Sequence, residues 1–271
     1  MADKFTEVKF PKSRVATLDM GDLKDFRNHV MGFLELDVTE ARVRIRDLRR
    51  STGQQLSFTA WLIKAICTAI DDFPIAAGYL SGKSKALVFE TIDIAMLIER
   101  DVDGYKVPLP YVLREANKID MFTITEEIES AKNTPLNGGA VINDRWSNIG
   151  TSVYYFLPGF LRRALWKAYF LRPKVSKHAM GNVSFTSIGM MGNQSGWFIS
   201  GSIHPLAFGV GSVVRKPGVV GNKIEIREYL NLSVGLDHDV IDGADMARFI
   251  NILARKIEKG AGLEDMENFN G

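Results

Sequence analysis

The feature that most constrains the fold is a run of apolar segments in the last third of the chain, broken by one tight turn. Strand-like composition recurs over four segments: 206–213, 218–220, 223–227 and 230–236. Gly221-Asn222 lies between the second and third segments and is a typical two-residue hairpin turn. Because strands joined by such a turn pair antiparallel, we expect a mostly antiparallel sheet that contains this hairpin.

Helical periodicity flanks these strands on both sides. The segments expected to be helical are 21–30, 40–51, 60–69, 120–132 and 243–258. The remaining expected strands are 32–38, 86–89, 92–98, 106–112 and 182–187. Pro108 and Pro110 favour an edge position or an irregular strand for the segment that contains them. Helices early and late, with strands between them, predict an α+β fold.

Composition excludes several classes of protein. The 271 residues are 46% hydrophobic, which suits one large domain with a substantial core. A formal charge of only +2 argues against a dedicated nucleic-acid binder. The single cysteine, Cys67, rules out an intrachain disulfide framework, and no histidine pair has metal-ligand spacing, so we expect no metal. The polar start, without an apolar signal core, predicts a cytoplasmic protein.

The small net charge conceals an asymmetry. From Arg145 to Ile224 there is no acidic residue, whereas ten lysines and arginines fall in that stretch. One interpretation is a surface that faces an anionic partner. The other is that the stretch is largely core strand and glycine-rich loop.

The strongest local motif lies where the last strand meets the last helix. The sequence 236–243 reads Leu-Asp-His-Asp-Val-Ile-Asp-Gly, so that His238 and Asp242 are four positions apart and Gly243 permits a sharp turn. Imidazole can accept a proton near neutral pH, and a nearby carboxylate can fix the turn that carries it. The motif therefore suits a general base, although a histidine that merely packs near a turn would give the same pattern.

The surroundings of this motif carry a family resemblance. Segments 216–249, 205–211, 185–192, 56–80 and 93–132 resemble the catalytic domain of the dihydrolipoyl acyltransferases of 2-oxo acid dehydrogenase complexes. That family shares its fold with chloramphenicol acetyltransferase. The resemblance implies a two-layer fold, with helices on one side of a mostly antiparallel mixed sheet. It also implies a homotrimer or a multiple of trimers, with active sites at subunit interfaces.

The resemblance implies acyl transfer between acyl-coenzyme A, as co-substrate, and a small thiol, hydroxyl or amine acceptor or carrier. His238 would take the proton of the attacking group. Thr186, with Ser187 beside it, would offer a hydroxyl to the oxyanion from the facing subunit. Asp242 would hold the turn through an arginine near the start of the chain, for which Arg14 is the candidate. No covalent lipoyl group and no metal are expected.

The chain also departs from the family pattern. Asp239 stands where the dehydrogenase enzymes usually have arginine, and no lipoyl or subunit-binding domain is recognisable. These departures leave open a non-catalytic trimeric scaffold of the same fold as the alternative function. Among the other histidines, His29 is expected at the surface and His204 in a structural role, while Asp237 is interpreted as a strand-end residue.

Residues 144–180 have no clear counterpart in the family and are interpreted as an insertion into a single domain over 1–271. A basic, aromatic helix is expected from Pro158 until Pro173 stops it. Three roles stay open for it. The segment 153–172 could lie on an anionic membrane surface, Tyr154 to Phe156 could cover an acceptor channel, or the helix could pack on the body or at the trimer contact.

Overall fold

The fold is organised around a mixed sheet, which a computed structural model describes together with its covering helices. The described residues are residue 6 and residues 14–23, 27–102, 105–133, 156–188, 195–199 and 201–264. Within these residues the strands form a six-stranded sheet of order β1-β8-β7-β6-β4-β5 and a separate two-stranded ribbon of β2 and β3. The strands are β1 (His29–Asp37), β2 (Tyr79–Ser81), β3 (Lys85–Leu87), β4 (Ile94–Val102), β5 (Tyr105–Leu113), β6 (Val183–Ser187), β7 (Leu206–Val220) and β8 (Lys223–Asp237).

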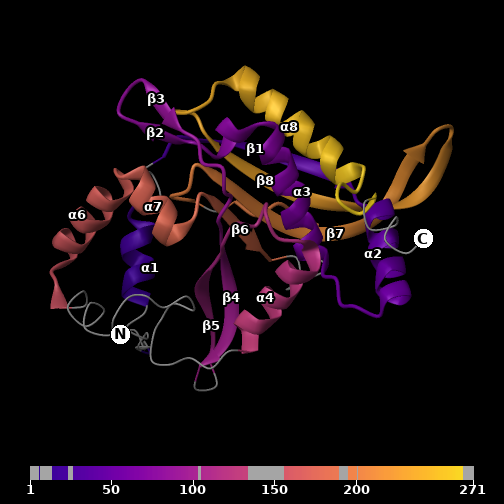
Figure 1. The fold of residues 1–271 in the computed structure, drawn as a ribbon, viewed down its shortest axis with the longest axis horizontal. Helices are drawn as coiled ribbons and strands as arrows, with labels where there is room; N and C mark the ends of the chain where they lie inside the picture. Colours follow the sequence, from indigo (N-terminus) through magenta and orange to yellow (C-terminus); the bar gives the residue numbers. More distant parts are fainter. Residues whose placement is uncertain are drawn as a thin grey trace, which may run out of the picture.

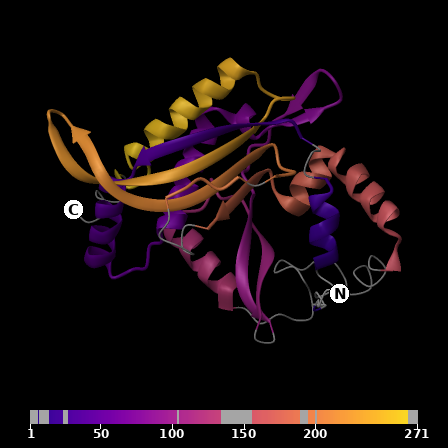
Figure 2. The same ribbon diagram turned by 180° about the vertical axis from the view of Figure 1, so that it is seen from behind.

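Helices cover one face of this sheet. Figures 1 and 2 show α2, α3 and α8 on the same side of the strands. Pairing is antiparallel except for β6, which runs parallel to both β4 and β7. The expected α+β class and two-layer arrangement are therefore confirmed. The helices are α1 (Arg14–Gly21), α2 (Thr39–Thr52), α3 (Phe58–Asp72), α4 (Met121–Asn133), α6 (Gly159–Phe170), α7 (Pro173–Met180) and α8 (Gly243–Glu258), with a 3₁₀ turn η2 (Pro74–Ala77).

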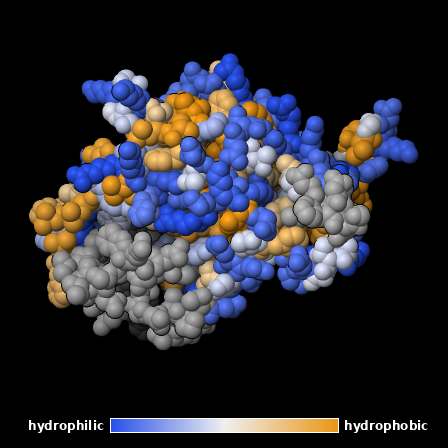
Figure 3. Space-filling view, in the orientation of Figure 1, coloured by the Kyte–Doolittle hydropathy of each residue, from blue (hydrophilic) through white to orange (hydrophobic). Residues whose placement is uncertain are grey.

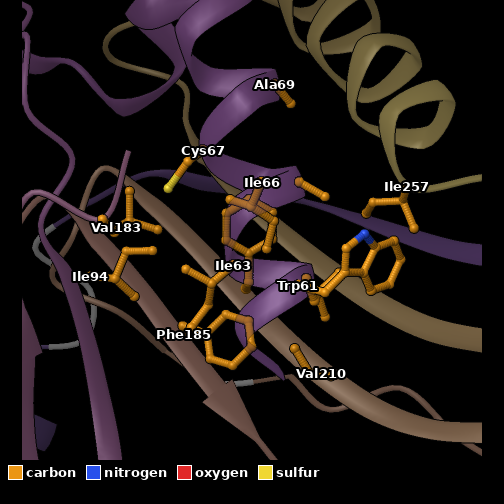
Figure 4. Close-up of a cluster of buried hydrophobic side chains, with 14 of the residues drawn as sticks. Trp61, Ile63, Ile66, Cys67, Ala69, Ile94, Val183, Phe185, Val210 and Ile257 are labelled. Atoms are coloured by element: carbon orange, nitrogen blue, oxygen red, sulfur yellow. The ribbon is translucent and has the colours of Figure 1, made fainter. Parts of the chain in front are cut away.

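The core lies between the sheet and α3. This helix is apolar nearly all round because it is enclosed by strands on one side and by α8 on the other. Figure 4 shows Ile63 and Ile66 of α3 facing Val183 and Phe185 of β6. Cys67 lies in the same cluster, where burial raises the pKa of its thiol far above neutrality, so it packs as a small apolar residue.

The β7–β8 hairpin is longer than the sequence pattern indicates. The four expected segments merge into two strands of 15 residues each, with a register irregularity between Val210 and Val213. Gly221 has a φ of 58°, in the left-handed region that the tight turn requires. The outer end of the hairpin extends beyond the body of the molecule (Figure 2).

One local expectation is wrong and two are confirmed. The helix expected over 21–30 instead ends at Gly21, and β1 already begins at His29 because its backbone pairs with β8. The helix expected from Pro158 does end before Pro173: α6 stops at Phe170, and Pro173 starts α7, where its missing N–H costs no hydrogen bond. The strand with Pro108 and Pro110 does lie at the sheet edge, as expected.

Candidate active site

The turn between β8 and α8 is fixed by its backbone hydrogen bonds. The His238 N–H donates to the Asn28 carbonyl at 2.9 Å, and the N–H groups of Val240 and Ile241 donate to the Asp237 carbonyl at 3.0 and 3.2 Å. The His238 side chain is nevertheless exposed. A rigid turn therefore presents an imidazole to the surface, which is the placement that a general base needs.

Asp242 orders the start of α8. Its Oδ1 accepts hydrogen bonds from the N–H groups of Ala244 and Asp245 at 3.0 and 3.2 Å, and Gly243 is the first helical residue. This N-cap defines where the chain leaves the turn. The side chain of Arg14 lies outside the described residues, so its pairing with Asp242 stays a prediction.

A buried ion pair beneath the turn was missed by the sequence interpretation. Arg27 Nη1 lies 2.6 Å from Asp237 Oδ2, and the two side chains are only 6% and 2% exposed. Arg27 also donates to the Ile203 carbonyl and stacks over the ring of Tyr79 at 4.9 Å. Asp237 is thus more than a strand-end residue. Through Arg27 it ties the end of β8, just before His238, to the segment that leads into β1.

The signal for this pair was present but not local. Asp237 directly precedes the histidine of the motif, and Arg27 lies two residues before His29. His29 is the register partner of Asp237 in the β1–β8 ladder. Only the pairing of these two strands brings the arginine and the aspartate together.

Two neutral histidines support the same end of the sheet. His204 is buried; its Nε2 donates to the Met180 carbonyl at 2.8 Å and its Nδ1 accepts from the Ser202 hydroxyl at 3.2 Å. Burial lowers the pKa of His204 to about 4. His29 donates to the His204 carbonyl at 2.9 Å, and burial also lowers the pKa of His29. The structural role expected for His204 fits this placement, whereas His29, expected at the surface, is half-buried.

Thr186 lies far from His238 within one chain. It is the fourth residue of β6, half-buried, with the exposed Ser187 after it. Across the sheet Thr186 pairs with Gly209, which pairs with Ser233. Two strand spacings give about 10 Å, and five residues from Ser233 to His238 give about 17 Å more along the strand.

The resulting separation is about 20 Å, which the two side chains cannot bridge. A single copy of the chain therefore does not bring the imidazole and the hydroxyl together. Any site that uses both groups needs two copies.

The surface hollow of about 450 Å³ near the end of α8 belongs to a different region. It is lined by Arg255, Lys256 and Lys259 together with residues of α3 and of 261–264. From Gly243 to Arg255 the helix rises about 18 Å, so this hollow does not adjoin the His238 turn. Across the described ranges, no group of three or more histidine, cysteine or carboxylate side chains is placed to hold a metal ion.

The chain matches a known family over most of its length. A family model described as 2-oxoacid dehydrogenases acyltransferase (catalytic domain) matches residues 5–143 and 173–263. The segment outside the match, 144–172, is shorter than the insertion expected over 144–180, because the match resumes at the first residue of α7.

Curated relatives are distant and longer. The chain is 24% identical to the dihydrolipoyllysine-residue acetyltransferase component of the pyruvate dehydrogenase complex of Acholeplasma laidlawii, over 77% of this chain and 32% of that protein. It is 25% identical to the lipoamide acyltransferase component of the branched-chain alpha-keto acid dehydrogenase complex of Pseudomonas aeruginosa, over 90% and 49%. The chain spans less than half the length of these two relatives.

Solved structures share the fold. The Azotobacter vinelandii dihydrolipoamide acetyltransferase matches with a TM-score of 0.69 at 17% identity, covering 96% of this chain and 94% of that one. A probable dihydrolipoamide acetyltransferase of Listeria monocytogenes matches with a TM-score of 0.66 at 19% identity, covering 95% and 96%. With the family match covering most of the chain, these findings lead to one conclusion: the chain belongs to the family of 2-oxoacid dehydrogenase acyltransferase catalytic domains.

Proposed function

We propose that the protein transfers an acyl group between coenzyme A and a small thiol acceptor of the dihydrolipoyl type, with His238 as general base. The observation that carries the proposal is the exposed imidazole on a turn held by backbone hydrogen bonds and by the buried Arg27–Asp237 pair. Two relatives named for lipoamide or dihydrolipoyllysine acyl transfer support the choice of acceptor.

The chemistry needs a base and an oxyanion donor. The His238 imidazole removes the proton of the acceptor thiol while its sulfur attacks the thioester carbonyl, which places the negative charge on oxygen. The Thr186 hydroxyl of a neighbouring copy donates a hydrogen bond to that oxyanion. Collapse of the intermediate breaks the bond to the coenzyme A sulfur, which takes the proton back from His238.

The separation between Thr186 and His238 supports a site shared by two subunits. We infer that the assembly is a trimer or a multiple of trimers, and one similar structure is the cubic core of a pyruvate dehydrogenase multienzyme complex. The Azotobacter enzyme was investigated for the catalytic role of a serine, a histidine and an asparagine. Its histidine and asparagine are four positions apart, as are His238 and Asp242 here.

The first experiment measures thiol release from acetyl-coenzyme A with dihydrolipoamide as acceptor. His238→Ala is expected to lower the rate by about 10²–10⁴ because the base is lost. Its free energy of unfolding should change by less than about 0.5 kcal/mol, since the side chain is exposed. Equal rates for the wild type and the variant would contradict His238 as the base, and no thiol release by an assembled wild type would favour the non-catalytic scaffold instead.

A second experiment tests the shared site. Co-expression of His238→Ala chains with Thr186→Ala chains should restore about a quarter of the wild-type rate, because random cyclic assembly completes that share of the sites. No recovery in mixed assemblies would contradict a site built from two copies.

A further inference from the structure

The surface that the acyl-transfer chemistry leaves unexplained is the outward face of α6 and the residues that flank it. The whole helix lies in the segment 144–172, which the family model does not match. Figure 3 shows hydrophobic side chains gathered over α6, at the left of the view. The exposed apolar residues are Phe156 (89%), Phe160 (64%), Leu161 (40%), Leu165 (56%) and Leu171 (66%).

The helix is anchored by its opposite face. Arg162 Nε lies 2.6 Å from Asp19 Oδ2 of α1, and both side chains are largely buried. Phe170 is 2% exposed, and its ring stacks on that of Trp166 with centroids 5.7 Å apart. The Arg162 ion pair and the burial of Phe170 hold this face of the helix against the body. The outward apolar face is a second one, which contacts among the described residues do not explain.

The outward face forms one continuous stripe. At about 100° per residue, Phe160, Leu161, Leu165 and Leu171 fall within an arc of about 140°, with Ala164 and Ala168 between them. A helix with such a stripe and a polar flank is suited to lie in the plane of a membrane interface.

Basic residues border the stripe. Arg163 and Lys167 follow one edge of the stripe, and Arg172 and Lys174 are exposed just beyond the end of the helix. Among the described residues, two carboxylates pair with basic residues of the helix: Asp19 of α1 pairs with Arg162, and Asp22, in the turn after α1, lies 3.3 Å from Arg163. Residues 145–172 include no aspartate or glutamate, so the border is positive on balance.

From the apolar stripe and its basic border together, we propose that the outward face of α6 binds an anionic lipid surface. The stripe enters the acyl-chain boundary while Arg163, Lys167 and Arg172 contact lipid phosphates. Among the described residues, no helix has the length and hydropathy of a membrane span. The contact that we propose is with the membrane surface. This proposal is independent of the acyl-transfer reaction.

The test is co-sedimentation of the whole protein with vesicles of phosphatidylglycerol mixed with phosphatidylcholine, compared with pure phosphatidylcholine. Binding to the anionic vesicles is expected, weakening at high salt. The triple variant Arg163→Gln/Lys167→Gln/Arg172→Gln should bind on the order of 100-fold more weakly. The double variant Phe160→Ser/Leu165→Ser should lose more than about tenfold.

A matched control removes equally exposed apolar side chains elsewhere. Val219 and Ile224 at the end of the β7–β8 hairpin are 77% and 78% exposed, and Val219→Ser/Ile224→Ser should leave vesicle binding unchanged. Unaltered thermal unfolding midpoints establish that each variant is folded.

Three results would overturn the proposal. Equal binding to neutral and anionic vesicles would show that charge plays no role. If both α6 variants bound vesicles as strongly as the wild type, the contact would lie elsewhere on the protein. A loss of molar mass in light scattering for Phe160→Ser/Leu165→Ser, without vesicle binding by the wild type, would assign the face to contacts between copies.

Discussion

Replacing Arg27 by methionine is expected to destabilise the fold strongly, because it leaves the Asp237 carboxylate buried without its cation. The pair is 2.6 Å apart and almost fully enclosed. Breaking a buried pair by removing one partner costs about 3–5 kcal/mol. That loss is a large part of the about 5–15 kcal/mol that stabilises a typical domain.

The double variant Arg27→Met/Asp237→Asn separates charge burial from lost packing. It leaves no uncompensated charge, and the asparagine amide oxygen can still accept from the Asp239 N–H, which lies 3.2 Å from Asp237 Oδ1. We therefore expect it to be more stable than Arg27→Met alone. Urea unfolding of both single variants and the double variant measures the coupling energy.

An exposed pair on α8 provides the control. Arg248 and Asp245 form an ion pair with side chains 67% and 35% exposed, and Arg248→Met should cost less than about 1 kcal/mol. If the Arg27 and Asp237 losses were simply additive in the double variant, the reasoning from an unpaired buried charge would be refuted.

Three further predictions concern single side chains. Thr186→Ala should lower kcat about 10²–10³-fold while Thr186→Ser stays active, measured by thiol release. Asp242→Ala should lower the free energy of unfolding by about 1 kcal/mol through the lost N-cap, whereas Asp242→Asn keeps it; equal unfolding curves for the two would contradict the cap. The pKa of His204 lies near 4 in the folded protein and 6.5 in the unfolded chain, so the unfolded chain takes up the proton first as the pH falls. Stability should therefore drop by on the order of 2 kcal/mol between pH 7 and pH 5, and urea unfolding should show a smaller drop for His204→Asn.

The sequence pattern was informative wherever the cause of structure is local. Apolar periodicity predicted α2, α3, α4 and α8 to within a few residues, and Gly221 with Asn222 predicted the hairpin turn. The α+β class followed from the order of these elements. The resemblance to the family directed attention to the turn at His238.

The contacts that the sequence pattern could not predict are those that depend on which strands lie next to each other. Arg27 and Asp237 are 210 positions apart, and nothing near either residue indicates that β1 and β8 lie side by side. The burial of His29 has the same origin, because its nitrogen meets a carbonyl from residue 204. The helix expected over 21–30 failed because pairing along β1 outweighed a weak local pattern.

In the proposed mechanism, the distance between Thr186 and His238 makes assembly a condition of turnover. If each site draws one group from each of two copies, an isolated subunit is inactive however well it folds. Specific activity should then fall on dilution below the dissociation constant of the assembly, and recover on concentration. Control of subunit association would thus act as control of the reaction rate.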